Sequence, residues 1–66
     1  MAVYKKIELV GTSSEGLEDA IKLAIKKASV TLHNLDWFEV KEIRGRLDGG
    51  DVKEFQVVLQ VGFKLD

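Results

Sequence analysis

The stretch Val52–Leu65, VKEFQVVLQVGFKL, decides the fold of this 66-residue chain. From position 55 onward every odd-numbered side chain is apolar, whereas most even-numbered side chains are polar or small. Alternation over this length predicts a long β-strand with one buried face and one polar face. The preceding Asp48-Gly49-Gly50-Asp51 is typical of a tight hairpin turn, so the segment before it should be an antiparallel partner.

That partner is predicted over residues 35–47, and its alternation changes partway along. Its apolar side chains are even-numbered at Phe38 and odd-numbered at Ile43. A β-bulge or a sharp bend near Lys41-Glu42 would reconcile the two halves. On this interpretation Phe38 faces the core.

A helix is predicted upstream of these strands, ending at about His33. Thr12 and Glu15 fit a capping box at its start, and Ser14 is a competing N-cap. Asn34 is a suitable stop, and His33 would stabilise the C-terminal end of the helix dipole. The predicted apolar face recurs at spacings of three and four and consists of Leu17, Ala20, Ile21, Ala24, Ile25, Ala28 and Leu32.

The elements predict an α+β fold within one domain over residues 1–66. A first strand over residues 3–10 precedes the helix, so the order is strand, helix, strand, strand. The simplest arrangement is a three-stranded antiparallel sheet in the order 1-3-2, with the helix on one face. Because the last two strands far exceed the usual ~5–6 residues, one helix cannot cover them. The uncovered surface should meet other subunits.

Composition excludes several classes of protein. The chain has no Cys and one His, which excludes disulfides and thiolate or His-cluster metal sites. The formal net charge of −1 argues against a nucleic-acid module driven by basicity. No apolar run approaches the ~20 residues that span a bilayer, and we expect a cytoplasmic protein without a membrane partner. Small folds without disulfides or metals usually rely on oligomerisation.

Four side chains are candidates for binding. Trp37 would lie on the sheet face opposite the helix, either as a packing residue or as a platform for a flat aromatic ligand. Gln56 lies on the polar face of the last strand, and its amide could pair with an imide edge. Arg44 and Lys64 are either solvated basic residues or phosphate contacts.

No catalytic residue is expected. One His and no Cys give no pairing of a nucleophile with a base. The carboxylates of Glu39, Glu42 and Glu54 show no pattern that makes one an acid and another a base.

Three strings together resemble the dodecin family. They are GTS leading into LEDAI (11–21), LDWFEVKEIRG (35–45) and FQVVLQVGFKL (55–65). The likeness covers nearly the whole chain. It implies a hollow spherical homododecamer that binds flavin for storage and for protection from light, without flavin chemistry.

The resemblance also implies roles for the four candidates. In dodecins paired flavins stack between symmetry-related tryptophans, and Trp37 occupies that position. The flavin-contacting glutamine falls on Gln56. Arg44 and Lys64 match phosphate partners in members that prefer flavin mononucleotide (FMN), although Lys64 stands where Arg is frequent. FMN or riboflavin is therefore the expected ligand, and coenzyme A binds in some relatives.

Two alternatives to this interpretation are kept. An enzyme would need a free flavin face, which a stacked pair denies to substrate. A pure assembly module without flavin would use Trp37 as interface packing. In addition, Trp37 and Arg44 have opposite parity, so either the bulge brings them to one face or they reach the ligand from different subunits.

Overall fold

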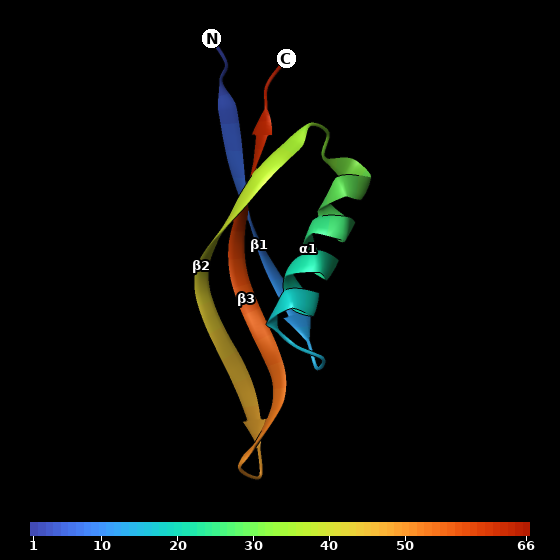
Figure 1. The fold of residues 1–66 in the computed structure, drawn as a ribbon, viewed down its shortest axis with the longest axis vertical. Helices are drawn as coiled ribbons and strands as arrows, with labels where there is room; N and C mark the ends of the chain where they lie inside the picture. The colour runs from blue at the N-terminus through green and yellow to red at the C-terminus, as the bar shows by residue number, and fades with distance from the viewer.

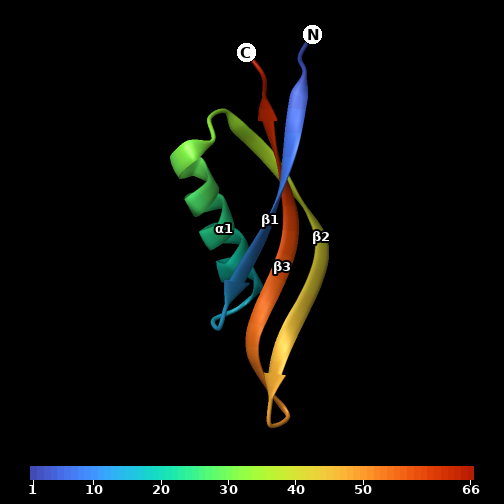
Figure 2. The same ribbon diagram turned by 180° about the vertical axis from the view of Figure 1, so that it is seen from behind.

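The computed structural model describes residues 1–66 and contains four elements (Figure 1). They are β1 (Tyr4–Ser13), α1 (Leu17–Thr31), β2 (Leu35–Asp48) and β3 (Asp51–Lys64). β3 lies between β1 and β2 and pairs antiparallel with both, which confirms the predicted order. Opposite views show α1 on one face of the sheet and no element on the other (Figures 1 and 2).

The core is small and lies between α1 and the middle of β3. Val57, Leu59 and Val61 are almost fully buried, and Ala20 of α1 packs against the first two. These four side chains belong to the odd-numbered face of β3 and to the predicted apolar face of α1, so both predictions are confirmed. The partly buried residues around this core are Leu9, Leu17, Ile21, Ala24 and Ile25.

Close approach of α1 to β1 depends on Gly11. A Cβ at this position would overlap the carbonyl oxygen of Ala20 and lie 2.9 Å from the Cβ of Ala24. Small residues on both elements therefore set the distance between helix and sheet.

The end of β1 differs from the prediction. The sequence predicts a strand ending at residue 10, yet β1 continues to Ser13 because Gly11 pairs with Val57 and extends the ladder. The predicted capping box is wrong for the same reason. Thr12 lies inside β1, where it pairs with Gln56, and is too early in the chain to cap α1.

The start of α1 is fixed by Ser13. Gly16 precedes the helix and makes no side-chain capping bond, so the competing Ser14 cap is also wrong. The Ser13 hydroxyl instead accepts a hydrogen bond from the Glu15 N–H (2.9 Å) and donates one to Asp19 Oδ2 (2.6 Å). These two bonds join the end of β1 to the first turn of α1.

The end of α1 lies two residues earlier than predicted. The helix ends at Thr31, and the N–H of Leu32 bonds to the Ala28 carbonyl at 2.9 Å. His33 therefore lies beyond the helix, exposed, and does not belong to its last turn. Asn34 adopts φ 62°, the left-handed conformation that Asn tolerates, which agrees with its predicted role as a stop.

The predicted bulge in β2 is present. Val40 pairs with Leu59 and Glu42 pairs with Val58, which leaves Lys41 without a partner. One extra residue reverses the parity of β2 relative to β3. Two further irregularities lie between Leu35 and Trp37 and between Arg46 and Leu47.

The hairpin between β2 and β3 turns at Gly49 and Gly50, as predicted. Their φ angles are 58° and 86°. Two consecutive positive φ angles are what a two-residue turn of type I′ requires.

The chain is extended for its mass. Its principal extents are 51 × 20 × 13 Å and its radius of gyration is 13.6 Å, against about 11 Å for a compact domain of this length. It exposes 4904 Å², whereas a typical monomer of this mass exposes about 4,200 Å². Figure 1 shows the reason, because the β2–β3 hairpin continues well beyond α1.

Phe38 is not a core residue within one chain. It pairs with Val61 and thus faces the helix side, but 47% of it remains exposed. α1 packs against β1 and β3, so the β2 edge is left open. The helix-facing side of β2 therefore contributes apolar surface that this chain does not cover.

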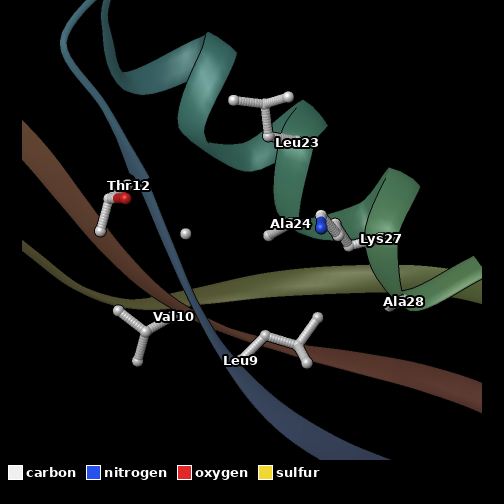
Figure 3. A pocket seen from close by; sticks show the side chains of 8 residues that line it. Leu9, Val10, Thr12, Leu23, Ala24, Lys27 and Ala28 are labelled. Atoms are coloured by element: carbon white, nitrogen blue, oxygen red, sulfur yellow. The ribbon is translucent and has the colours of Figure 1, made fainter.

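An open groove of about 510 Å³ adds to the uncovered surface (Figure 3). It lies between β1 and α1, with Val10 on the strand and Leu23 on the helix among its exposed apolar residues. No helix of the structure combines the length and the apolar character needed to cross a membrane.

Candidate functional site

The polar face of the sheet carries all four sequence-predicted binding residues. Trp37 pairs with Gly62 and Arg44 pairs with Gln56. Directly paired residues of antiparallel strands point to the same face, so Trp37, Arg44 and Gln56 share the face opposite α1. The bulge at Lys41 thus corrects the parity of Trp37 and Arg44.

Trp37 lies flat on the backbone of β3. A Cβ on Gly62 would overlap Cε2 and Cζ2 of the indole and lie 2.7 Å from Cδ2. Contact with three atoms of one ring places the face of the indole against Gly62. The side chain is nevertheless 40% exposed, because its outer face points away from the sheet. This arrangement suits a planar aromatic ligand, which requires an open ring face.

The ring of Tyr4, on the edge strand β1, lies beside the indole of Trp37. The two ring centroids are 6.3 Å apart and the rings are tilted by 45°. The Tyr4 hydroxyl donates a hydrogen bond of 2.9 Å to Oδ2 of Asp36, the residue before Trp37. This bond and the negative charge of Asp36 raise the pKa of the Tyr4 phenol above its ordinary value.

An ion pair lies next to the indole on the same face. Lys6, which pairs with Gly62, places its Nζ 2.7 Å from Oε1 of Glu39. This hydrogen bond and the positive charge of Lys6 lower the pKa of Glu39 below its ordinary 4.5. Both side chains are well exposed, so the pair orders the surface more than it stabilises the fold.

Gln56 and Arg44 lie together at the other end of this face. Gln56 donates an Nε2 hydrogen bond of 3.0 Å to Glu54 Oε1, which Arg46 Nε approaches at 3.7 Å. Arg44 contacts the carboxylate of Glu42 and remains half-exposed. The amide oxygen of Gln56 and part of the Arg44 guanidinium therefore remain available to a ligand.

The four candidates form two separate groups within one chain. Lys64 lies two residues from Gly62, next to Trp37, and joins none of the ion pairs. Gln56 lies six residues from Gly62 along β3, or about 20 Å at the usual rise per residue. One chain therefore cannot place Trp37 and Gln56 on a single small ligand.

Sequence reasoning missed several residues of this face. Gly62 has a recognisable signal, since a glycine inside a strand often marks close approach of another group. Tyr4 and Asp36 gave no signal, because their contact depends on the register and on the irregularity before Trp37. Gln60, also on this face, has a buried Oε1 without a hydrogen-bond donor in the chain.

Fold and site together define a class: a small α+β subunit with a long uncovered hairpin and an aromatic platform on its open face. The model of the Dodecin family matches residues 3–66, and the chain belongs to the dodecin family. A dodecin from Thermus thermophilus is 66% identical over 64 residues, with 97% of this chain and 93% of the relative covered.

Solved structures agree with this assignment. A Thermus thermophilus protein superposes with a TM-score of 0.95 at 64% identity, over 100% of this chain and 97% of the other. Dodecin from Streptomyces davaonensis gives a TM-score of 0.93 at 52% identity, over 98% and 96%. Both the fold and the sequence are thus those of a dodecin along the whole chain.

Proposed function

We propose that this protein is a flavin-storage protein that also protects flavin from light, and that its indole platform binds the isoalloxazine ring. The observation that carries this proposal is the packing of Trp37 on Gly62. The indole lies flat on the backbone there, and its outer face stays open. A planar, electron-poor ring stacked on an electron-rich indole gains about 0.5–1.5 kcal/mol beyond area burial. Membership of the dodecin family supports the same ligand.

The remaining candidates have complementary roles in this proposal. The amide of Gln56 offers both an acceptor and donors to the edge of the pyrimidine ring. Arg44 and Lys64 would contact the phosphate of FMN, Arg44 as a bidentate donor and Lys64 as a point charge. The ligand would therefore be FMN in preference to riboflavin, with coenzyme A as a further possible ligand of the same assembly.

The proposed site is complete only between subunits. Because Trp37 and Gln56 of one chain are about 20 Å apart, the flavin would stack on Trp37 of one subunit and meet Gln56 of another. A homododecamer, the assembly that the resemblance implies, would supply that second subunit. Symmetry would duplicate each contact and pair the flavins.

Storage, in preference to catalysis, follows from the same geometry. When bound, flavin supplies a planar chromophore whose excited state accepts one electron. Trp37 in stacking contact would donate that electron and quench the excited state. A ring enclosed between two aromatic groups offers no face to a substrate, so the protein would not be an enzyme.

The test is a fluorescence titration of the purified protein with FMN. We expect saturable quenching at about one flavin per chain, loss of quenching in Trp37→Ala, and an oligomer of unchanged mass. Riboflavin should bind more weakly, and Arg44→Ala and Lys64→Ala should reduce that difference. No quenching at any FMN concentration would reject flavin storage, and monomeric Trp37→Ala would favour an assembly role for Trp37.

A further inference from the structure

The chain has one Trp and one Tyr, and the structure places them side by side. Their ring centroids are 6.3 Å apart, although Tyr4 and Trp37 lie on the two different edge strands. At this separation electron transfer between the rings is fast, because the rings are nearly in contact. No other readily oxidised ring is present, since the remaining aromatic residues are three phenylalanines and one histidine.

A proton acceptor is already bonded to Tyr4. Oxidation of a phenol is favourable at neutral pH only if its proton leaves together with the electron. The Tyr4 hydroxyl donates to Asp36 Oδ2 at 2.9 Å, so the proton needs to move only along an existing hydrogen bond. The raised pKa of Tyr4 also keeps the phenol protonated before the reaction.

We propose that Tyr4 and Asp36 form a repair relay that returns an electron to Trp37 after the indole has been oxidised. The indole radical cation takes one electron from the Tyr4 ring, and the phenolic proton passes to the carboxylate of Asp36. The products are a neutral indole, a neutral tyrosyl radical and a protonated Asp36.

The relay is completed by a reductant from solution. Tyr4 is 41% exposed in the single chain, and in the proposed relay a thiol supplies one electron to the tyrosyl radical. The proton of Asp36 then returns to the phenolate oxygen, and the thiol leaves as a thiyl radical that has lost its own proton to water. Trp37 is thereby restored, and the relay protects the stacking residue from oxidative damage.

In the cell, the oxidant that makes the relay useful is the photoexcited flavin of the proposed function, and in this respect the inference rests on it. Transfer between Tyr4 and Trp37 itself needs no flavin. It is therefore tested on ligand-free protein, independently of flavin binding.

The experiment is pulse radiolysis of the intact, ligand-free protein with azide radical, a one-electron oxidant that reacts preferentially with indole. We expect the absorption of the indole radical to decay as that of a tyrosyl radical rises. The rate should not depend on protein concentration, and it should fall in heavy water because a proton moves with the electron. The single Trp and single Tyr assign both signals without ambiguity.

Two variants separate the roles. Tyr4→Phe keeps the ring and should abolish the tyrosyl signal while the indole radical persists. Asp36→Asn keeps both rings and should slow the transfer by at least about tenfold, the rate equivalent of one hydrogen bond to a charged group. Circular dichroism and native mass confirm that each variant is folded and assembled.

The outcomes are distinct. Equal lifetimes of the indole radical in the parent protein and in Tyr4→Phe would overturn the relay. A rate that rises with protein concentration would also overturn it, and an unchanged rate in Asp36→Asn would remove Asp36 from it. Loss of flavin binding with an intact transfer step would reject the proposed function alone.

Discussion

At the residue scale, the orientation of Trp37 depends on a glycine in the neighbouring strand. Any side chain at position 62 would occupy the space of the indole. Gly62 therefore leaves a flat stretch of backbone against which the indole packs in one orientation. A binding platform gains from such restriction, because less rotamer freedom is lost when the ligand stacks.

We predict that Gly62→Ala weakens FMN binding by about tenfold without unfolding the protein, since relieving an overlap in a packed site costs about 1–3 kcal/mol. Fluorescence titration measures the affinity. Gly45→Ala is the control, because its Cβ would make one tight contact, with Glu54 O at 3.1 Å, but lies on the opposite face of the sheet and does not touch the indole. Equal affinity of Gly62→Ala and the parent protein for FMN would show that Gly62 does not orient the indole for binding.

The ion pair of Lys6 and Glu39 makes a pH-dependent contribution. Lys6 lowers the pKa of Glu39 in the folded state. The contribution is therefore present above the unfolded pKa of Glu39 and is lost as the pH falls through the lower folded value. We predict that Lys6→Ala raises the pKa of Glu39 in an NMR titration. The Tm of Lys6→Ala should lie slightly below that of the parent protein at neutral pH, and the two Tm values should converge in acid.

The sequence predicted the face of Trp37 correctly but not its neighbours. Alternation within one strand is a local property, and it places Trp37 opposite Phe38. The contacts with Tyr4 and Gly62 depend on register across three strands, which local alternation does not specify. The separation of Trp37 from Gln56 was missed for the same reason.

At the element scale, the bulge in β2 decides which side chains reach the open face. From Trp37 to Lys41 the odd-numbered residues of β2 face away from α1, and from Glu42 to Arg46 the even-numbered residues do. The parity change in the sequence predicted this feature, because apolar side chains mark the buried face on both sides of it. The start of α1 was mispredicted because several polar residues in a row each resemble a cap. Only the tertiary structure shows that Ser13, through its bonds to Glu15 and Asp19, is the residue that joins β1 to the first turn.

The contact of α1 with β1 at Gly11 should be sensitive to a single methyl group. We predict that Gly11→Ala destabilises the fold by about 1–3 kcal/mol, because the overlap is with backbone of α1 and cannot be relieved by a side-chain rotation. Urea unfolding monitored by circular dichroism gives the free energy. Val10→Ala, at a neighbouring position that is 57% exposed, should change it much less. Equal effects of the two substitutions would contradict the close approach.

At the scale of the whole molecule, one chain is an incomplete structure. Nine of 66 residues are buried, and the hairpin beyond α1 exposes Ile43, Leu47 and Val52. Such a surface is costly in water at about 25 cal/mol per Å² of apolar area. Burial against other subunits removes that cost. In the proposed function it would also bring Gln56 of one subunit toward Trp37 of another, so assembly and the proposed site would depend on each other.

This dependence predicts the effect of a charge on the hairpin. Ile43 pairs with Val57 on the helix-facing side and is 59% exposed in the single chain. A carboxylate buried there without a partner costs several kcal/mol, and each 1.4 kcal/mol changes an association constant tenfold. Ile43→Glu should therefore lower the mass in sedimentation and abolish FMN quenching together, although Ile43 lies on the opposite face from Trp37.

The matched control is Ser29→Glu, which adds the same charge at an exposed position of α1. It should preserve both the mass and the quenching. An Ile43→Glu protein of parental mass would show that the hairpin is not part of the assembly interface. A dissociated Ile43→Glu protein that still quenches FMN with parental affinity would show that one chain suffices for binding, and the division of the site between subunits would be wrong. The separation of Trp37 and Gln56 requires that Ile43→Glu lose both the parental mass and FMN quenching while Ser29→Glu keeps both.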